Sequence, residues 1–211
     1  MKTKNYIRSF LKPDHPLLPE LEKANCIRND IQPPVEFETA KLLSLLIQFS
    51  NAQKVLELGT SNGYSTIWLG TALKKTGGKI ISIESKDRLY DEAVINIEKA
   101  GFKNSCELIF GDAEVEAQKL LEGNNQFDLI FQDCGKYLYP KMLEMTVKLL
   151  RPGGMIVADD TLFKVNDNVR ENLGKHTDEY NRAVFDHTQL YSTILPIGHG
   201  LTVSVKIDNS P

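Results

Sequence analysis

The sequence predicts an α/β protein with a doubly wound, Rossmann-like sheet, mostly parallel with an antiparallel C-terminal hairpin and with helices on both faces. Two observations lead to this prediction. From residue 54 onward, short apolar runs alternate with helical segments, which is typical of a parallel sheet covered by helices. Near the C-terminus, only Gly198, His199 and Gly200 separate two strand-like runs, and so short a loop permits only an antiparallel pair.

Each element follows from its hydrophobic pattern. The expected parallel strands are residues 55–58, 79–84, 106–112, 127–133 and 155–160. The expected helices, with apolar residues at helical spacing, are residues 36–49, 63–73, 87–100 and 140–150. Residues 162–175 are expected to be a lid or substrate loop and then a helix, and residues 190–197 and 201–207 the final hairpin.

The chain is expected to have two parts. Five prolines break residues 1–50 into short helical pieces, so we interpret this region as an N-terminal helical cap. Residues 51–211 then form the main domain, and a chain of 211 residues is long enough to bury a continuous core. Sequence does not decide whether the cap covers a ligand or forms a dimer interface.

Composition narrows the classes of protein. The net charge of −3 and the pI near 5.9 give no overall basic character of the kind that nucleic-acid binding requires. The three cysteines form no C-x-x-C pair, which favours free thiols in a reducing compartment. No apolar run approaches the roughly 20 residues of a membrane span. We therefore expect a cytoplasmic protein with no membrane partner.

The first strand leads into a glycine-containing turn, and strand ends of this kind bind ligands in open parallel sheets. Gly59 and Gly63 permit a tight turn and close approach of a ligand to the backbone. The helix after Gly63 offers free N–H groups to an anion, and Ser65 adds a hydroxyl donor. The spacing is G-x-x-x-G rather than G-x-G-x-x-G, which disfavours a dinucleotide site.

The next strand ends supply further polar groups. Glu84 ends the second strand, where a carboxylate accepts hydrogen bonds from ribose hydroxyls. Gly111, Asp112 and Ala113 follow the third strand, where an adenine edge is expected. Taken singly, a glycine pair is often only a turn and a strand-end glutamate is often only solvated. Their order on successive strands favours a nucleoside-containing ligand.

Three carboxylates are expected to crowd one place, because Asp133 ends the fourth strand and Asp159 and Asp160 end the fifth. Neighbouring strands lie about 4.8 Å apart, and like charges at about 4 Å repel by about 4 kcal/mol at an effective dielectric constant of about 20. Either a proton is shared or a hard cation (Mg²⁺, Mn²⁺ or Ca²⁺) lies between them. The alternative is a solvated acidic rim paired with Lys136 or Lys164.

Together, these segments resemble the catechol and caffeoyl-CoA type of class I S-adenosylmethionine-dependent O-methyltransferase. The resemblance rests on VLELGTSNGYS, Glu84, QDCGKYLYP, LLRPGGMIVADD and LPIGHGLTVSVK, which occur in the family's order and span residues 32–207. It implies a cofactor, S-adenosylmethionine, and a divalent cation, of which Mg²⁺ is the leading choice. It also implies methyl transfer to a hydroxyl group of a small acceptor.

The resemblance implies roles for individual residues. Lys136 matches the catalytic lysine, which would act as general base if its pKa were lowered. The residues that match cofactor contacts are Glu57, Gly59, Ser61, Gly63, Ser65, Glu84, Asp112, Ala113 and Asp133. The residues that match metal ligands are Asp133, Asp159 and Asp160.

Three positions depart from the resembled pattern. Asp160 stands where the third metal ligand is usually Asn, and His199 stands where the tail often reads P-I-G-D-G. The usual D-A-D-K is here D-C-G-K, so Gly135 removes a side chain beside the adenine and the acceptor. A histidine at a hairpin tip either contacts substrate or is exposed and inert.

The function we expect is methyl transfer to a small, vicinal-diol aromatic acceptor by a homodimer. Tyr137, Tyr139 and Phe163 are either pocket walls or core residues. A second hypothesis is a tRNA 5-hydroxyuridine O-methyltransferase, which a basic stripe would favour; its candidate residues are Lys164, Arg170, Lys175 and Arg182. Two further hypotheses are an NAD-dependent dehydrogenase and a non-catalytic regulator that binds S-adenosylmethionine.

Overall fold

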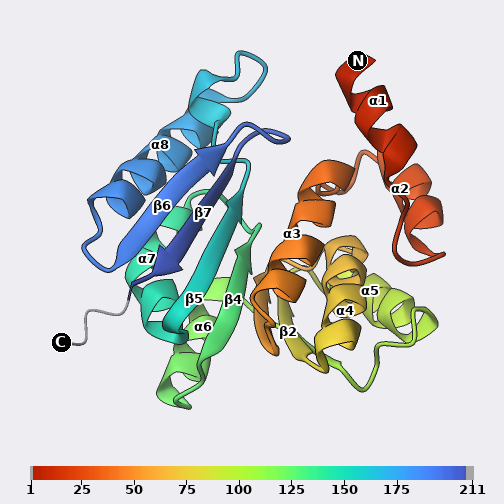
Figure 1. Ribbon diagram of the computed structural model, residues 1–211, viewed down its shortest axis with the longest axis horizontal. Coiled ribbons are helices and arrows are strands. Elements are labelled where there is room, and N and C mark those ends of the chain that lie inside the picture. The colour runs from red at the N-terminus through yellow and green to blue at the C-terminus, as the bar shows by residue number, and fades with distance from the viewer. Residues whose placement is uncertain (1, 208–211) are drawn as a thin grey trace.

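Residues 2–207 are described by the computed structural model, in which a single mixed sheet runs through the molecule (Figure 1). The strands are β1 (Lys54–Leu58), β2 (Lys79–Glu84), β3 (Cys106–Phe110), β4 (Phe127–Gln132), β5 (Leu150–Asp159), β6 (Leu190–Leu195) and β7 (Leu201–Lys206). Their order is β3-β2-β1-β4-β5-β7-β6. The first five strands are parallel, whereas β7 is antiparallel to both β5 and β6. This confirms the predicted sheet and its terminal hairpin.

Helices cover both faces of the sheet. They are α1 (Lys2–Phe10), α2 (Leu18–Cys26), α3 (Phe37–Phe49), α4 (Tyr64–Thr76), α5 (Asp87–Lys99), α6 (Ala113–Glu122), α7 (Leu138–Leu149) and α8 (Glu171–Asp186), with a short 3₁₀ turn, η1 (Phe163–Val165). Helices α3, α4 and α5 lie on one face, and α6, α7 and α8 on the other (Figure 1). Each face therefore has its own apolar cluster.

The structure differs from the expected elements in three places. Helix α6 is an addition to them, and its first turn is capped by Asp112, which accepts from two backbone N–H groups. Helix α7 begins two residues before Pro140, and proline is tolerated in a first turn because its missing N–H needs no partner there. Strand β5 begins at Leu150, with an irregular register before Met155.

The N-terminal region packs on the same core as the sheet. Leu18 of α2 and Phe37 and Leu43 of α3 belong to the apolar cluster that contains Trp68 of α4. Helix α1 buries no residue and contacts α3 through ion pairs, such as Lys4 to Glu36 at 2.6 Å. The cap and the main domain therefore share one apolar core. The division of the chain at residue 50 remains a proposal.

Candidate active site

The carboxyl ends of β1, β4 and β5 meet at one edge of the sheet. Leu58 pairs with Gln132, and Gln132 pairs with Ala158, so Asp133 and Asp159 end adjacent strands at the same level. Because β7 runs antiparallel to β5 with Leu201 opposite Asp159, the tip of the final hairpin also lies at this edge. The fold thus brings together side chains that are far apart in the sequence.

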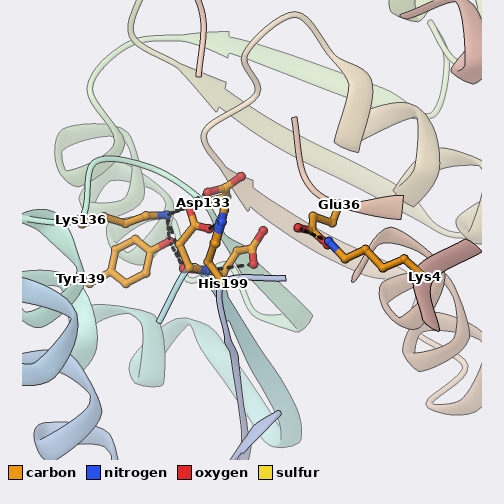
Figure 2. Close-up of polar contacts among 8 residues, drawn as sticks. Lys4, Glu36, Asp133, Lys136, Tyr139 and His199 are labelled. Atoms are coloured by element: carbon orange, nitrogen blue, oxygen red, sulfur yellow. Dashed lines mark hydrogen bonds and ion pairs between the residues drawn. The ribbon is translucent and has the colours of Figure 1, made fainter. Parts of the chain in front are cut away.

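Lys136 lies at the centre of this cluster (Figure 2). Its Nζ donates to Asp133 Oδ1 at 3.0 Å and to the phenol oxygen of Tyr139 at 2.9 Å, and it pairs with Asp160 Oδ2 at 3.1 Å. The Lys136 side chain is only 8% exposed. Tyr139 donates in turn to the carbonyl oxygen of Gln132 at 2.7 Å and is fully buried. It therefore orients the lysine and is not a pocket wall.

Charge and burial shift the pKa values of this cluster. Burial raises the pKa of Asp159 well above its ordinary value, and the neighbouring Asp133 and Asp160 raise it further. Burial also raises the pKa of Asp133, although its side chain is 26% exposed and more open to solvent screening. The crowding of carboxylates predicted from sequence is therefore present.

The pKa of Lys136 is shifted in the direction opposite to the one expected for a general base. Burial lowers it, but the groups around the ammonium outweigh burial and hold the pKa well above 10.5. Tyr139 is a neutral phenol, because burial raises its own pKa, so the aspartates are the effective anions. Asp133 and Asp160 share this ammonium, and Asp159 lies beside them as a third carboxyl group. A divalent cation on the same oxygens would stabilise their ionised forms.

The donor chemistry suits a hard divalent cation, since carboxylate oxygens are its preferred ligands. Within residues 2–207, however, no three His, Cys, Asp or Glu side chains have the arrangement of a metal site. Lys136 lies between Asp133 and Asp160, and an Asp159 oxygen accepts from the Asp160 backbone N–H at 2.9 Å. A cation would compete with these partners for the same oxygens.

The turn after β1 depends on its glycines. Gly59 has φ +101°, and a Cβ there would overlap the Asp133 carbonyl oxygen, so only glycine fits. Ser61 also has a positive φ of 52°. Gly63 has φ 87° and stands directly before α4, whose first N–H groups are free for an anion. Ser65 lies nearly buried in the first turn of that helix.

The cap contributes a contact to this turn that sequence reasoning did not find. Asn25 of α2 and Asn62 of the turn exchange two amide hydrogen bonds, at 2.6 and 3.3 Å, and both are buried. Asn96 of α5 donates to the Asn62 carbonyl oxygen at 2.9 Å. No local pattern identifies such a pair, because its members are 37 residues apart.

Glu84 lies where a ribose-binding carboxylate is expected. One oxygen accepts from the Ser61 backbone N–H at 2.7 Å and the other from the Lys86 N–H at 2.8 Å. These bonds fix the carboxylate and leave further lone pairs for hydroxyl groups. Asp112, by contrast, uses its carboxylate to cap α6 at 2.9 Å, and the adjacent Ala113 is buried. Any role of these two residues near an adenine would then come from the backbone or from apolar contact.

Glu57 is fully buried at the end of β1. Its Oε2 accepts from the hydroxyls of Thr66 at 2.6 Å and Ser82 at 2.5 Å, whereas Oε1 has no hydrogen-bond partner among the described residues. Burial raises the pKa of Glu57 from 4.5 to about 7. We therefore interpret Glu57 as a residue that supports the turn from beneath through α4 and β2.

A cavity of about 340 Å³ lies beside the carboxylate cluster, between residues 162–168 and the hairpin tip. His199 lines it, and its Nδ1 lies 3.2 Å from Asp160 Oδ1. Phe163 packs against the His199 ring with ring centres 5.7 Å apart, while Tyr137 is half exposed. The cavity thus adjoins the carboxylate cluster through His199, which contacts Asp160.

Two residues of the basic stripe considered for the tRNA hypothesis are paired with acidic residues. Of the four residues in the considered basic stripe, Arg182 pairs with Asp178 at 3.1 Å and Lys175 with Glu179 at 3.9 Å on the same helix. Between residues 2 and 207, no helix has the length and apolarity to cross a membrane.

Solved structures with this fold define the class. The O-methyltransferase from Bacillus cereus, solved in complex with S-adenosylhomocysteine, superposes with a TM-score of 0.86 at 27% identity over 98% of this chain and 97% of that chain. The strand order and the reversed β7 are therefore those of a class I S-adenosylmethionine-dependent methyltransferase.

Sequence comparisons identify the family. The family described as O-methyltransferase matches residues 8–207. A catechol O-methyltransferase from Niastella koreensis is 35% identical over 74% of this chain and 72% of its own length. The caffeoyl-CoA O-methyltransferase of Populus kitakamiensis is 28% identical over 96% of this chain and 91% of its own length. The chain belongs to this O-methyltransferase family and is an enzyme of the catechol and caffeoyl-CoA type, which removes the dehydrogenase and regulator hypotheses.

The raised pKa of Glu57 predicts a pH-dependent stability. The folded protein holds this proton more tightly than the unfolded chain, so the stability it contributes is complete below pH 4.5 and is lost as the pH rises through about 7. Glu57→Gln removes the titration. The free energy of unfolding of the variant relative to the wild type should therefore rise by about 3 kcal/mol across this range.

Urea denaturation at several pH values measures this difference. The control is Glu107→Gln, since Glu107 is exposed on β3 and its variant should follow the wild type at every pH. If the wild type and Glu57→Gln keep a constant difference, Glu57 does not titrate in this range and our interpretation is wrong.

Proposed function

We propose that this enzyme transfers the methyl group of S-adenosylmethionine to one hydroxyl of a small vicinal-diol aromatic acceptor, with the aid of a divalent cation. The observation that carries the proposal is the cluster of three carboxylates with one buried ammonium, next to a cavity of about 340 Å³. Two adjacent acceptor oxygens would match such a charge-rich edge of the sheet.

The cofactor-binding residues in this proposal come from the first strand ends. The backbone of the Gly59–Gly63 turn and the first turn of α4 would hold the cofactor's carboxylate, with Ser65 as a hydroxyl donor. Glu84 is fixed by two backbone N–H groups and would accept from the ribose hydroxyls. Bound S-adenosylmethionine supplies an electrophilic methyl group on a sulfonium.

Lys136 is the proposed catalytic residue. Tyr139 and the aspartates fix its Nζ, so it is directed toward the position that we assign to the acceptor hydroxyls. In its ammonium form it donates to a developing oxygen anion. It accepts the hydroxyl proton only once its pKa falls, and loss of the surrounding negative charge produces that fall. Much of the remaining catalysis is orientation of the attacking oxygen.

A divalent cation is the proposed source of that charge compensation. Asp133, Asp159 and Asp160 would hold it, and Mg²⁺ is our first choice because the donors are carboxylate oxygens. Such a cation lowers the pKa of a bound hydroxyl. Asp160 brings a full charge where the related pattern usually has a neutral Asn, which would strengthen cation binding.

A homodimer is the proposed assembly. Large apolar side chains are exposed on two helices of the cap, and they include Tyr6 and Phe10 of α1 and Leu45 and Phe49 of α3. Burial of such side chains favours association. Sedimentation of the full chain at micromolar concentration measures the assembly, and a monomer at all concentrations would contradict it.

The turn after β1 gives a matched pair of variants. Gly59→Ala and Gly77→Ala both place a side chain at a positive φ, but only at Gly59 does the new Cβ meet backbone, at the Asp133 carbonyl group. Gly77→Ala should cost about 1 kcal/mol of stability and leave cofactor affinity unchanged. Gly59→Ala should weaken S-adenosylhomocysteine binding at least about 10-fold, as measured by calorimetry. Equal affinities in both variants would contradict the placement of the cofactor at this turn.

The proposed reaction is tested by methyl transfer from labelled S-adenosylmethionine to catechol, with Mg²⁺ or with a chelator. Transfer should require the cation and fall about 100-fold or more in Lys136→Met and in Asp159→Ala. Mg²⁺ binding by calorimetry should be lost in Asp159→Ala and kept in Lys136→Met. Transfer that persists in the chelator would remove the cation from the proposal. Cofactor binding without transfer to any catechol would overturn the proposed acceptor class and favour hydroxyuridine in tRNA.

A further inference from the structure

Helix α2 of the cap contacts the turn after β1 through one pair of side chains. Asn62 Nδ2 donates to Asn25 Oδ1 at 2.6 Å, and Asn25 Nδ2 donates to Asn62 Oδ1 at 3.3 Å. Each of the two residues is 3% exposed. Each amide thus satisfies one donor and one acceptor of the other, so removal of one leaves buried polar atoms of the other without that partner.

The backbone around Asn62 needs support from its surroundings. Ser61 before it has φ 52° and Gly63 after it has φ 87°, and the left-handed region is unfavourable for a residue with a Cβ such as serine. Such a conformation persists where neighbouring groups fix it. The shape of this turn is therefore determined by its contacts and not by the backbone preferences of its own residues.

Three elements outside the turn supply such contacts. Glu84 at the end of β2 accepts from the Ser61 N–H at 2.7 Å, and Asn96 of α5 donates to the Asn62 carbonyl oxygen at 2.9 Å. Both of these hydrogen bonds fix the backbone. Asn25 fixes the side chain of Asn62, and of the three contacts it is the one that comes from the cap.

The position of Asn25 is itself fixed at a second point, on α5. Arg28 follows α2 and donates to both carboxylate oxygens of Glu92, at 2.6 and 3.1 Å. Arg88 of the same helix pairs with Asp30. The end of α2 is thus anchored on α5 by ion pairs, so that Asn25 faces the turn from a fixed place.

The pair lies next to the groups that we assign to the cofactor. Asn62 directly precedes Gly63, and α4 begins after Gly63 with its first N–H groups free for an anion. A shift of the Asn62 backbone would move these N–H groups. A site loses affinity when its donors are held less rigidly in the binding geometry, so the contact with the cap bears on cofactor binding.

We propose that Asn25 is a positioning residue for the cofactor, because through Asn62 it holds the turn after β1 in the form that binds S-adenosylmethionine. The inference rests on the proposed placement of the cofactor at this turn and deepens it. It assigns helix α2 of the cap to the cofactor site, a role that the sequence leaves open. Loss of Asn25 weakens cofactor binding and leaves the transfer step from bound cofactor unchanged.

Asn25→Ala and Asn29→Ala test the proposal in the full chain, and they are matched because Asn29 is an exposed asparagine in the loop after α2. Calorimetry with S-adenosylhomocysteine should give a dissociation constant about 5- to 10-fold higher in Asn25→Ala and unchanged in Asn29→Ala. In methyl transfer, KM for S-adenosylmethionine should rise by the same factor, with kcat within about 2-fold of the wild type. An unchanged dissociation constant in Asn25→Ala, or a loss confined to kcat, would overturn the proposal.

Ile47→Val tests whether a general loosening of the cap would have the same effect. Ile47 is fully buried in α3, so loss of one methyl group should lower the Tm about as much as Asn25→Ala does, without touching the turn. At a temperature well below the melting transition of every variant, Ile47→Val should bind S-adenosylhomocysteine as the wild type does. Equal weakening in both variants would mean that affinity follows the stability of the cap and not the amide pair.

A double-mutant cycle tests the route through Asn62. If Asn25 acts on the cofactor through Asn62, Asn25→Ala should weaken binding of S-adenosylhomocysteine no further in a chain that already carries Asn62→Ala. Losses that add in the double variant would show that Asn25 acts by another route, and the assignment would be wrong.

Gly59→Ala separates a failure of this inference from a failure of the proposed cofactor placement. If Gly59→Ala and Asn25→Ala both leave the affinity for S-adenosylhomocysteine unchanged, the placement of the cofactor at this turn fails. If Gly59→Ala weakens binding and Asn25→Ala does not, the placement stands and the assignment of Asn25 fails. Calorimetry with S-adenosylhomocysteine needs no acceptor, so its result is independent of the acceptor class.

Discussion

The buried ammonium of Lys136 is the constraint on which the rest of the site depends. A charge that is 8% exposed needs close partners, since burial without them costs several kcal/mol. Its partners are Asp133 at the end of β4, Asp160 after β5 and Tyr139 in the first turn of α7. Three elements must therefore meet at one point. The parallel order β1-β4-β5 and the short loop before α7 produce that meeting.

The same constraint joins the proposed cofactor side to the proposed acceptor side. Gly59 approaches the backbone of Asp133 so closely that no Cβ fits, so the turn after β1 packs directly on the residue that pairs with Lys136. On the other side, Asp160 contacts Lys136 with one oxygen and His199 with the other. Lys136, Asp160 and His199 therefore form one chain of contacts of 3.1 and 3.2 Å.

Sequence predicts the parts of the site that follow from strand ends. Asp133 and Asp159 can be placed together because consecutive parallel strands end at the same edge. The orienting role of Tyr139 and the Asn25–Asn62 pair do not follow from sequence, because such long-range contacts leave no periodic signal. The raised pKa of Lys136 does not follow from sequence for a related reason. It depends on how many carboxylates reach Nζ, and spacing along the chain does not give that number.

The structure also links two departures that look independent in the sequence. Asp160 replaces a usual Asn, and His199 replaces a usual Asp, yet their side chains are in contact. The carboxylate of Asp160 lies after β5, where Lys136 and His199 both contact it. An Asn at residue 160 would leave the imidazole without a charged partner, and an Asp at residue 199 would face Asp160 with like charge. Electrostatics thus favours the two departures together. The residue at position 160 therefore influences the cavity through its contact with His199.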